Sequence, residues 1–338
     1  MALALHSYTG GGKMSKSKIE WTDRVWNPVT GCSKISPGCD NCYAERMSKR
    51  FGEKWGLPSE EPFKVTVHME RLDQPLKWNK PSRIFVCSMA DLFHDDVSFK
   101  AIAEVFQRMM ECQHHIFLIL TKRPDSMKNF FDFVKPSGRS WPLPNVWLGV
   151  TAENQEQADK RIPILLQIPA AKRFVSVEPM LGPVNLKPWF PWDNHRKKLQ
   201  GWKRNPDYKQ GLHWVICGGE SGPGARPMHP EWAQSLRDQC QAAGVPFFFK
   251  QWGEWWPISQ MPDGYCDSLY YPAPEDDPEA TRPCRCKNGA LQLEGDLLPV
   301  HQSGSWGHGA MQTFKVGKKA AGSLLDSQEW KQAPEVAL

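Results

Sequence analysis

The chain has 338 residues, of which 40% are hydrophobic and 23% are charged, and its net charge at pH 7 is +5. This composition is typical of a globular protein and excludes a disordered or low-complexity chain. The charge is too small for this length to indicate nucleic-acid binding by itself. No apolar run approaches the length of a membrane span, so we expect a cytoplasmic protein without a membrane partner.

The chain begins with MALALHSYTGGGK, which lacks the long apolar core and the cleavage site of a signal peptide. We predict that residues 1–17 are a disordered leader, and that residues 1–13 are dispensable. Without a secretory signal, the ten cysteines favour metal binding or buried thiols over disulfides. Four of them lie in apolar contexts and are predicted to be buried free thiols: Cys87, Cys112, Cys217 and Cys240.

Short β-branched and aromatic runs then alternate with amphipathic helix patterns. The runs are continuous, as in strands covered on both faces, and they span residues 24–31, 83–88, 115–121, 145–151, 173–177, 213–219 and 245–250. The helix patterns span residues 40–52, 98–113, 123–134, 154–168 and 229–244. This alternation predicts an α/β fold, a partial or closed (β/α) barrel of about six or seven parallel units. A doubly wound sheet stays open as the alternative.

The pattern changes after the last of these strands. We assign residues 18–250 to the barrel and residues 251–338 to a loop-rich C-terminal extension, in which Pro, Asp and Glu are frequent. Within the barrel, residues 186–211 form an irregular insertion that is basic and aromatic. The insertion is predicted to be either a solvated loop or a substrate contact.

Three cysteines near the N-terminus, Cys32, Cys39 and Cys42, have the spacing C-x6-C-x2-C. Soft thiolates at such spacing select zinc or an iron–sulfur cluster. A structural zinc ion takes four ligands, and no fourth Cys or His lies nearby in the sequence, although the distant Cys284 could complete the set. A [4Fe–4S] cluster on three thiolates keeps one iron open for chemistry. Both metals, and purely structural thiols, remain alternatives at this point.

The cysteine segment and several later motifs resemble a family. The chain is similar to a phage-associated, radical-SAM-like family of unknown function with a three-cysteine motif, within the radical S-adenosylmethionine (SAM) superfamily. The motifs that carry this resemblance are IEWTDRVWNPVTGCSKISPGCDNCYAERM, FVCSMADLFHD, LILTKRPDSM, WLGVTAENQ, VSVEPMLGPV, VICGGESGPGARPM, FFFKQWGEW and VGKKAAGSLLD. Two features depart from the common radical SAM motif: the first spacing is three residues longer, and Asn41 stands where an aromatic residue usually precedes the third cysteine.

The resemblance implies a reaction class. Cys32, Cys39 and Cys42 would hold a [4Fe–4S] cluster, and SAM would bind its open iron. One electron, from a donor such as flavodoxin or ferredoxin, would cleave SAM to a 5′-deoxyadenosyl radical that abstracts hydrogen from a substrate. The phage association favours a nucleic acid or nucleotide as substrate, the basic and aromatic insertion agrees with this weakly, and peptide substrates remain open. The oligomeric state is left open.

Polar residues follow most of the predicted strands, where the reactive groups of a β/α barrel gather. Catalytic roles are predicted for Lys122, Glu178 and Lys250. Contacts with the cofactor are predicted for Ser88, Asp91, Arg123, Thr151, Glu153, Asn154, Gly218, Gly219 and Glu220. A SAM carboxylate needs a cation, which Lys122 or Arg123 would supply, and the other polar groups would meet its amino group and ribose. A structural ion network around the barrel rim is the alternative for each charged residue.

Two further readings stay open. Cys266, Cys284, Cys286 and His301 would form a second metal site or lie in a plain loop with free thiols. For the whole chain, the rivals of a radical SAM enzyme are a zinc-stabilised nucleic-acid-binding protein without catalysis, and a barrel that keeps a cluster only for structure or redox sensing.

Overall fold

The computed structural model describes residues 17, 19–53, 57, 59–135, 141–191, 211–278, 282–299 and 309–335. Within these residues, seven parallel strands form one sheet in the order β1-β4-β5-β6-β7-β8-β9. Their bounds are Arg24–Trp26, Arg83–Val86, Ile116–Thr121, Val146–Thr151, Lys172–Val177, Trp214–Gly218 and Phe247–Gln251.

The strand order is the order of the chain, so the sheet has no point at which the winding reverses. This excludes the doubly wound alternative. In the described residues β1 and β9 do not pair with each other, so the sheet is a half-open barrel and not a closed one. The predicted α/β partial barrel is therefore confirmed.

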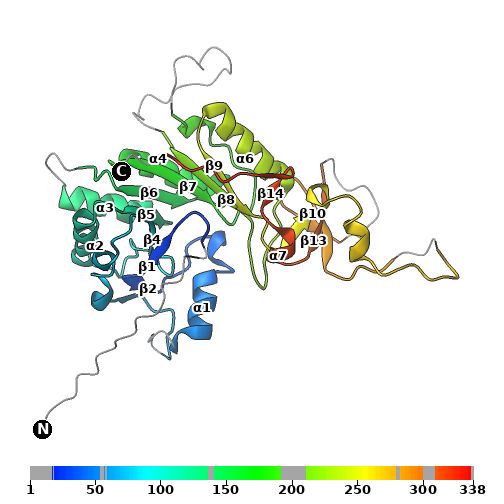
Figure 1. Cartoon of the computed structure of the whole chain (residues 1–338), viewed down its shortest axis with the longest axis horizontal. Coiled ribbons are helices and arrows are strands. Elements are labelled where there is room, and N and C mark those ends of the chain that lie inside the picture. Colours follow the sequence, from blue (N-terminus) through cyan, green and yellow to red (C-terminus); the bar gives the residue numbers. More distant parts are fainter. Residues whose placement is uncertain are drawn as a thin grey trace, which may run out of the picture.

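Helices cover the outer face of the sheet (Figure 1). Their bounds are α2 Phe99–Glu111, α3 Pro124–Val134, α4 Gln155–Gln167 and α6 Pro230–Ala243. The α1 helix, Tyr43–Phe51, stands apart from them and follows the cysteine segment. Ser98 accepts a hydrogen bond from Ala101 N and so caps α2.

The two faces of the sheet carry different cores. The outer face packs aliphatic side chains against the helices, for example Ile119, Val150 and Val175. The inner face carries large rings, and Trp147, Phe174 and Trp214 pack there with ring centroids about 6 Å apart. Many tryptophans are thus buried, and these rings fill the interior of the half-barrel.

The first predicted strand, residues 24–31, is two short strands in different sheets. After β1, the chain turns at Pro28, and β2, Val29–Thr30, pairs antiparallel with β3, Thr66–Val67. Proline cannot donate to a ladder, which explains the break. Of the basic insertion at residues 186–211, residues 192–210 lie outside the described residues, as do residues 1–16 of the predicted leader.

The C-terminal region forms a second, antiparallel sheet in the order β10-β13-β11-β12 at one end of the long axis (Figure 1). Its strands are Trp255–Pro257, Met311–Lys315, Asn288–Leu291 and Leu297–Leu298. The short helix α7, Lys318–Ala321, and the strands β14, Leu324–Leu325, and β15, Gln328–Glu329, complete the region. The chain then returns to β9, where Phe249 N donates to Trp330 O at 2.7 Å. The boundary at residue 250 stays a prediction.

In the described residues, no helix is both long enough and apolar enough to cross a bilayer.

Candidate functional site

A pocket opens at the carboxyl ends of the parallel strands. It encloses about 270 Å³, and its wall combines residues of the cysteine loop, defined as residues 31–42, with residues near the ends of several strands. Phe85 and Leu120 form part of this wall and also pack against the rings inside the half-barrel. The pocket therefore rests on the aromatic core.

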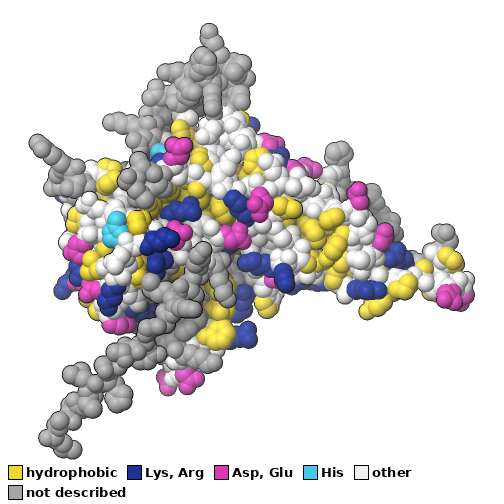
Figure 2. Space-filling view, viewed as in Figure 1, with side chains coloured by type: hydrophobic (Ala, Val, Ile, Leu, Met, Phe, Trp, Pro, Cys, Tyr) yellow, Lys and Arg dark blue, Asp and Glu magenta, His cyan; other side chains and the backbone are white. Residues whose placement is uncertain are grey.

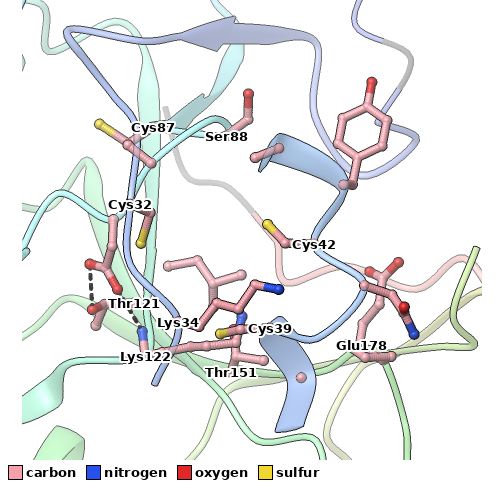
Figure 3. A pocket seen from close by; sticks show the side chains of 18 of the residues that line it. Cys32, Lys34, Cys39, Cys42, Cys87, Ser88, Thr121, Lys122, Thr151 and Glu178 are labelled. Atoms are coloured by element: carbon pink, nitrogen blue, oxygen red, sulfur yellow. Dashed lines mark hydrogen bonds between the residues drawn. The ribbon is translucent and has the colours of Figure 1, made fainter. Parts of the chain in front are cut away.

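All three cysteines of the cysteine loop line this pocket, and their thiols are free and partly exposed. Figure 3 shows Cys32, Cys39 and Cys42 around one shared space. Across the described ranges, no three His, Cys, Asp or Glu side chains surround the position of a single metal ion. A four-iron cluster binds each thiolate to a different iron, so its ligands stand farther apart than those of one zinc ion. The three thiols thus share one pocket, and they are the soft ligands that zinc or an iron–sulfur cluster takes.

The start of the cysteine loop requires a glycine. Gly31 has φ +83°, and a Cβ at this position would lie 2.1 Å from the carbonyl oxygen of Lys64. Its amide donates to Met89 O at 3.0 Å, which ties the loop to the segment after β4. The loop then makes a 3-10 turn at Pro37–Cys39, and α1 begins directly after Cys42.

Arg123, just beyond β5, holds the first part of the loop. Its Nη2 donates to Ser33 Oγ at 2.8 Å and to Ser33 O at 3.1 Å, and its Nη1 lies 3.4 Å from Cys32 Sγ. Asp91, whose Oδ2 lies 3.5 Å from Nη1, pairs with this guanidinium inside the protein. Burial raises the pKa of the Cys32 thiol and Asp91 adds to the effect, whereas Arg123 opposes both. The guanidinium thus favours the thiolate that a metal requires.

Glu153, just beyond β6, holds the middle of the loop. Its Oε1 accepts from Gly38 N at 3.1 Å, and its Oε2 pairs with Arg161 Nη1 of α4 at 2.8 Å. The carboxylate side chain is 0% exposed and the guanidinium side chain is 3% exposed. A buried pair of this kind fixes the height of the loop over the barrel.

Glu220 and Arg226 hold the last part of the loop from the other side. Arg226 donates from Nη2 to Glu220 Oε1 at 2.7 Å and to Pro37 O at 2.8 Å, and from Nη1 to Asp40 Oδ2 at 3.1 Å. Glu220 Oε2 accepts from Asn41 Nδ2 at 3.0 Å. Burial would raise the pKa of Glu220, but the bonds from Arg226 and Asn41 hold it below its usual value. We call Arg123, Glu153, Glu220 and Arg226 the loop clamp.

Other polar side chains of the pocket are not engaged with the loop. The Lys122 ammonium makes no hydrogen bond or ion pair within the described part of the chain. Glu178 Oε1 accepts from Lys250 Nζ at 2.7 Å, and Ser88 Oγ donates to Asn27 Oδ1 at 3.3 Å. Figure 3 places Lys122, Thr151 and Glu178 on the side of the space where Cys39 lies, and Ser88 on the opposite side.

The structure brings most of the predicted site residues to the pocket. Those that line it are Cys32, Cys39, Cys42, Ser88, Asp91, Lys122, Arg123, Thr151, Glu178, Gly219 and Glu220. Lys250 and Glu153 lie behind the wall and act on residues in it. Asn154 does not line the pocket, and its Oδ1 caps α4 by accepting from Gln157 N at 3.0 Å.

Packing requires a glycine at 219 and leaves little room for a side chain at 218. A Cβ at Gly219 would lie 1.9 Å from Trp252 O, and a Cβ at Gly218 would lie 3.3 Å from the carboxyl carbon of Glu178. Gly219 therefore lets two backbone segments approach, and Gly218 leaves room for the Glu178–Lys250 pair. Their predicted contact with a cofactor stays a prediction.

Two residues of the site were missed by reading the sequence. Arg226 donates a hydrogen bond to Pro37 O of the cysteine loop. Asn41 lies in that loop and donates a hydrogen bond to Glu220. Arg226 lies in the quoted motif VICGGESGPGARPM, but it stands eight residues after the last residue of β8, where no periodic pattern indicates its direction. Asn41 replaces the usual aromatic residue, and this departure was the signal that its side chain does something else.

The remaining thiols divide into two groups. Cys87, Cys112, Cys217 and Cys240 are free and buried, as predicted. In the C-terminal sheet region, Cys284 Sγ lies 3.7 Å from Cys286 Sγ, and both thiols and Cys266 are partly exposed. His301, which was predicted to join them, lies outside the described residues.

Comparisons with known proteins come from three sources. The family model described as "Protein of unknown function (DUF5131)" matches residues 16–334. No curated protein matches the chain. The solved structure of a spore photoproduct lyase complexed with dinucleoside spore photoproduct is similar at a TM-score of 0.34 and 10% sequence identity, over 78% of this chain and 69% of that chain. No function is drawn from that likeness.

The family match spans the same motifs that carried the resemblance in the sequence, from the cysteine segment to the last helix. The chain therefore belongs to the DUF5131 family of proteins of unknown function.

Proposed function

We propose that this protein is a radical SAM enzyme that holds a [4Fe–4S] cluster on Cys32, Cys39 and Cys42. The observation that carries the proposal is the meeting of these three thiols in one pocket at the carboxyl end of a partial (β/α) barrel. Three thiolates leave one iron of a four-iron cluster without a protein ligand, which gives SAM a position to bind.

When bound, the cluster supplies the electron that splits SAM and yields a 5′-deoxyadenosyl radical for hydrogen abstraction. The chain's own residues bind, orient and exclude water. Phe63, Phe85 and Leu120 give the pocket apolar walls that keep bulk water from a reactive species. The activity also needs an electron donor, for which we propose flavodoxin or ferredoxin, in a reducing compartment such as the cytoplasm.

Lys122 is the residue we assign to the SAM carboxylate. Its ammonium faces the pocket without a partner in the described residues, whereas the Arg123 guanidinium is already engaged with Ser33 and Asp91. A cation–carboxylate hydrogen bond is about twice as strong as a neutral one. The hydroxyls of Ser88 and Thr151 are then our candidates for the amino group and the ribose.

The clamp residues are assigned to positioning. Arg123, Glu153 and Glu220 touch the cysteine loop, so we propose that they act on the cofactor through the loop. Glu178, with Lys250 behind it, lines the pocket, and its Oε1 accepts from Lys250 Nζ at 2.7 Å. We propose that this pair serves the substrate, which we take to be a nucleotide or nucleic acid.

Anaerobic reconstitution with iron and sulfide tests the proposal. We expect about four irons per chain and a brown protein, as for a single four-iron cluster. The variant with Cys32, Cys39 and Cys42 all changed to Ala should lose the iron. The matched variant with Cys266, Cys284 and Cys286 changed to Ala should keep it. Reduction in the presence of SAM should then give 5′-deoxyadenosine.

Two results would contradict the proposal. One is a colourless protein that carries a single zinc ion on Cys32, Cys39 and Cys42. The other is an iron-loaded protein that forms no 5′-deoxyadenosine under reduction, which would leave a structural or sensing cluster.

A further inference from the structure

An aromatic ring and a guanidinium stand together on α1 at the edge of the pocket. Tyr43 directly follows Cys42, lines the pocket, and is 59% exposed. The Arg46 guanidinium carbon lies 6.0 Å from the centroid of the Tyr43 ring. Residues three apart on a helix share a face, so both groups project on the same side. An exposed ring beside a cavity is a surface on which another flat ring can stack.

The guanidinium of Arg46 lies against a glycine from another part of the chain. A Cβ at Gly222 would lie 2.2 Å from Arg46 Nη1, and Gly222 itself has φ +96°. The guanidinium therefore packs onto the backbone of the segment after β8. Within the described residues it makes no hydrogen bond and no ion pair, and its printed contact is the one with the Tyr43 ring.

The pocket's own carboxylates do not neutralise this charge, because each is already engaged. Asp91 pairs with Arg123, Glu178 pairs with Lys250, and Glu220 pairs with Arg226. Among the described residues, the positive charges without an ion pair include those of Lys122 inside the pocket and of Arg46 near its edge. If Lys122 meets the SAM carboxylate, Arg46 is a cation available to the substrate.

The charge is local. On the face that Figure 2 shows, Lys and Arg side chains are interspersed with Asp and Glu, and they form no continuous basic stripe. A net charge of +5 is small for 338 residues, so the protein as a whole attracts a polyanion only weakly at long range. Within the described residues, contacts at the pocket edge are then candidates for recognition.

We infer that the substrate of the proposed enzyme is a single-stranded nucleic acid, with one base stacked on Tyr43 and a neighbouring phosphate held by Arg46. Aromatic rings and arginines are the groups with which proteins hold single strands, because every base has a flat face and every unit has a phosphate. The apolar pocket beside Tyr43 suits a flat heterocycle, whereas an acidic peptide would leave the exposed ring unused. The catalytic part of this inference rests on the proposed function; the binding part does not.

The binding experiment uses the full chain after anaerobic reconstitution, with fluorescein-labelled DNA and RNA strands of about 12 nucleotides, a length within the range that such sites cover. Anisotropy gives the affinity at several salt concentrations between about 50 and about 200 mM. We expect Tyr43→Ala to weaken binding about tenfold and Tyr43→Phe to restore it, because stacking and not the hydroxyl carries the contact. Arg46→Ala should lower the slope of log affinity against log salt by about 0.7, the value for one phosphate of a single strand.

The C-terminal region offers a matched control. Tyr271 is 53% exposed and carries its own arginine, with the Arg285 guanidinium carbon 5.0 Å from the ring centroid. Tyr271→Ala should leave oligonucleotide binding unchanged. If it weakens binding as much as Tyr43→Ala does, exposed tyrosines contribute without regard to place, and the inference is wrong.

Other outcomes also overturn it. The inference is wrong if the unsubstituted protein binds neither the DNA strand nor the RNA strand. It is also wrong if Tyr43→Ala lowers the affinity for SAM but leaves the affinity for the strands unchanged. Heparin could also displace the strands equally well from the parent protein and from Tyr43→Ala. That result would mean that binding is only the general attraction of a polyanion. Iron content, measured on the same samples, keeps the two proposals apart. Strand binding that depends on Tyr43 in a protein without iron sinks only the proposed reaction.

Discussion

The buried pair of Glu153 and Arg161 gives the sharpest test of how the cysteine loop is held. Glu153 Oε2 lies 2.8 Å from Arg161 Nη1, and Glu153 Oε1 accepts from Gly38 N of the loop. At this separation and an effective dielectric constant of about 20, the gross attraction is about 6 kcal/mol. Desolvation offsets much of it, but removing one partner leaves a buried charge and costs about 3–5 kcal/mol.

Glu153→Gln keeps the shape and the acceptor for Gly38 and removes only the charge. We expect the free energy of unfolding, from urea denaturation, to fall by about 3 kcal/mol. Iron retention after reconstitution should fall with it, because the loop loses a fixed support. The same change at Glu61, which forms an exposed pair with Lys64, should leave the free energy of unfolding nearly unchanged. The double variant Glu153→Gln with Arg161→Met should be more stable than the single variant, since no unpaired charge remains.

The reasoning fails if the free energy of unfolding of Glu153→Gln lies within about 0.5 kcal/mol of that of the parent protein, because an effect of that size is typical of a surface ion pair. It also fails if stability falls but iron retention does not change. In that case the pair supports the barrel without positioning the loop.

Acid gives an independent check on the same pair. Burial would raise the pKa of Glu153, but Arg161 and a hydrogen bond from Ser36 hold it below its usual value. The pKa of Glu153 is lower in the folded protein than in the unfolded chain, where it is about 4.3. The ionised carboxylate therefore stabilises the fold fully at a pH above the unfolded-state pKa, and this stabilisation is lost as the pH falls through the folded-state pKa. The parent protein should therefore lose more stability on acidification below about pH 4 than Glu153→Gln does. Equal losses in the two proteins would contradict this.

Three further changes follow from the site and the sheet. Arg226→Ala should lower iron retention after reconstitution severalfold, because it frees the last part of the loop, whereas Arg237→Ala on α6 should not. Lys122→Ala should weaken SAM binding about tenfold, the loss of one charge-assisted hydrogen bond, with iron content unchanged; a parallel loss of iron would mean that it supports the loop instead. Gly149→Ala places a Cβ 2.6 Å from the Phe174 ring and should cost about 1–3 kcal/mol in urea denaturation; a neutral result would mean that the rings of the half-barrel repack freely.

The strands could be predicted because their signal is local. Runs such as RIFV and IFLILT are buried on both faces, so their composition alone marks them, and six of the seven predicted strands agree with the structure to within about two residues. The exception, residues 24–31, contains Pro28, which ends one strand and starts another. The aromatic filling of the half-barrel was less predictable. In a strand that is buried on both faces, the sequence does not indicate which face a tryptophan such as Trp147 occupies.

The site could be predicted in place but not in detail. Because parallel strands bring their carboxyl ends to one edge, residues after each strand had to gather, and most of those named line one pocket. What each side chain bonds to depends on a few ångströms of loop position. Glu153 was predicted to meet a cofactor, but in the structure its oxygens are engaged with Gly38 and Arg161. Sequence spacing carries no information about such partners.

The long spacing between Cys32 and Cys39 has a physical explanation in the loop clamp. The six residues between them include those that the clamp holds: Ser33 by Arg123, Pro37 by Arg226, and Gly38 by Glu153. A shorter loop would reach the same pocket with fewer backbone groups available for hydrogen bonds to residues outside the loop. The added length therefore lets three charged residues, which follow three different strands, hydrogen-bond to the loop. This arrangement ties the geometry of the thiols to the barrel itself, so that a change in any one clamp residue should alter metal binding.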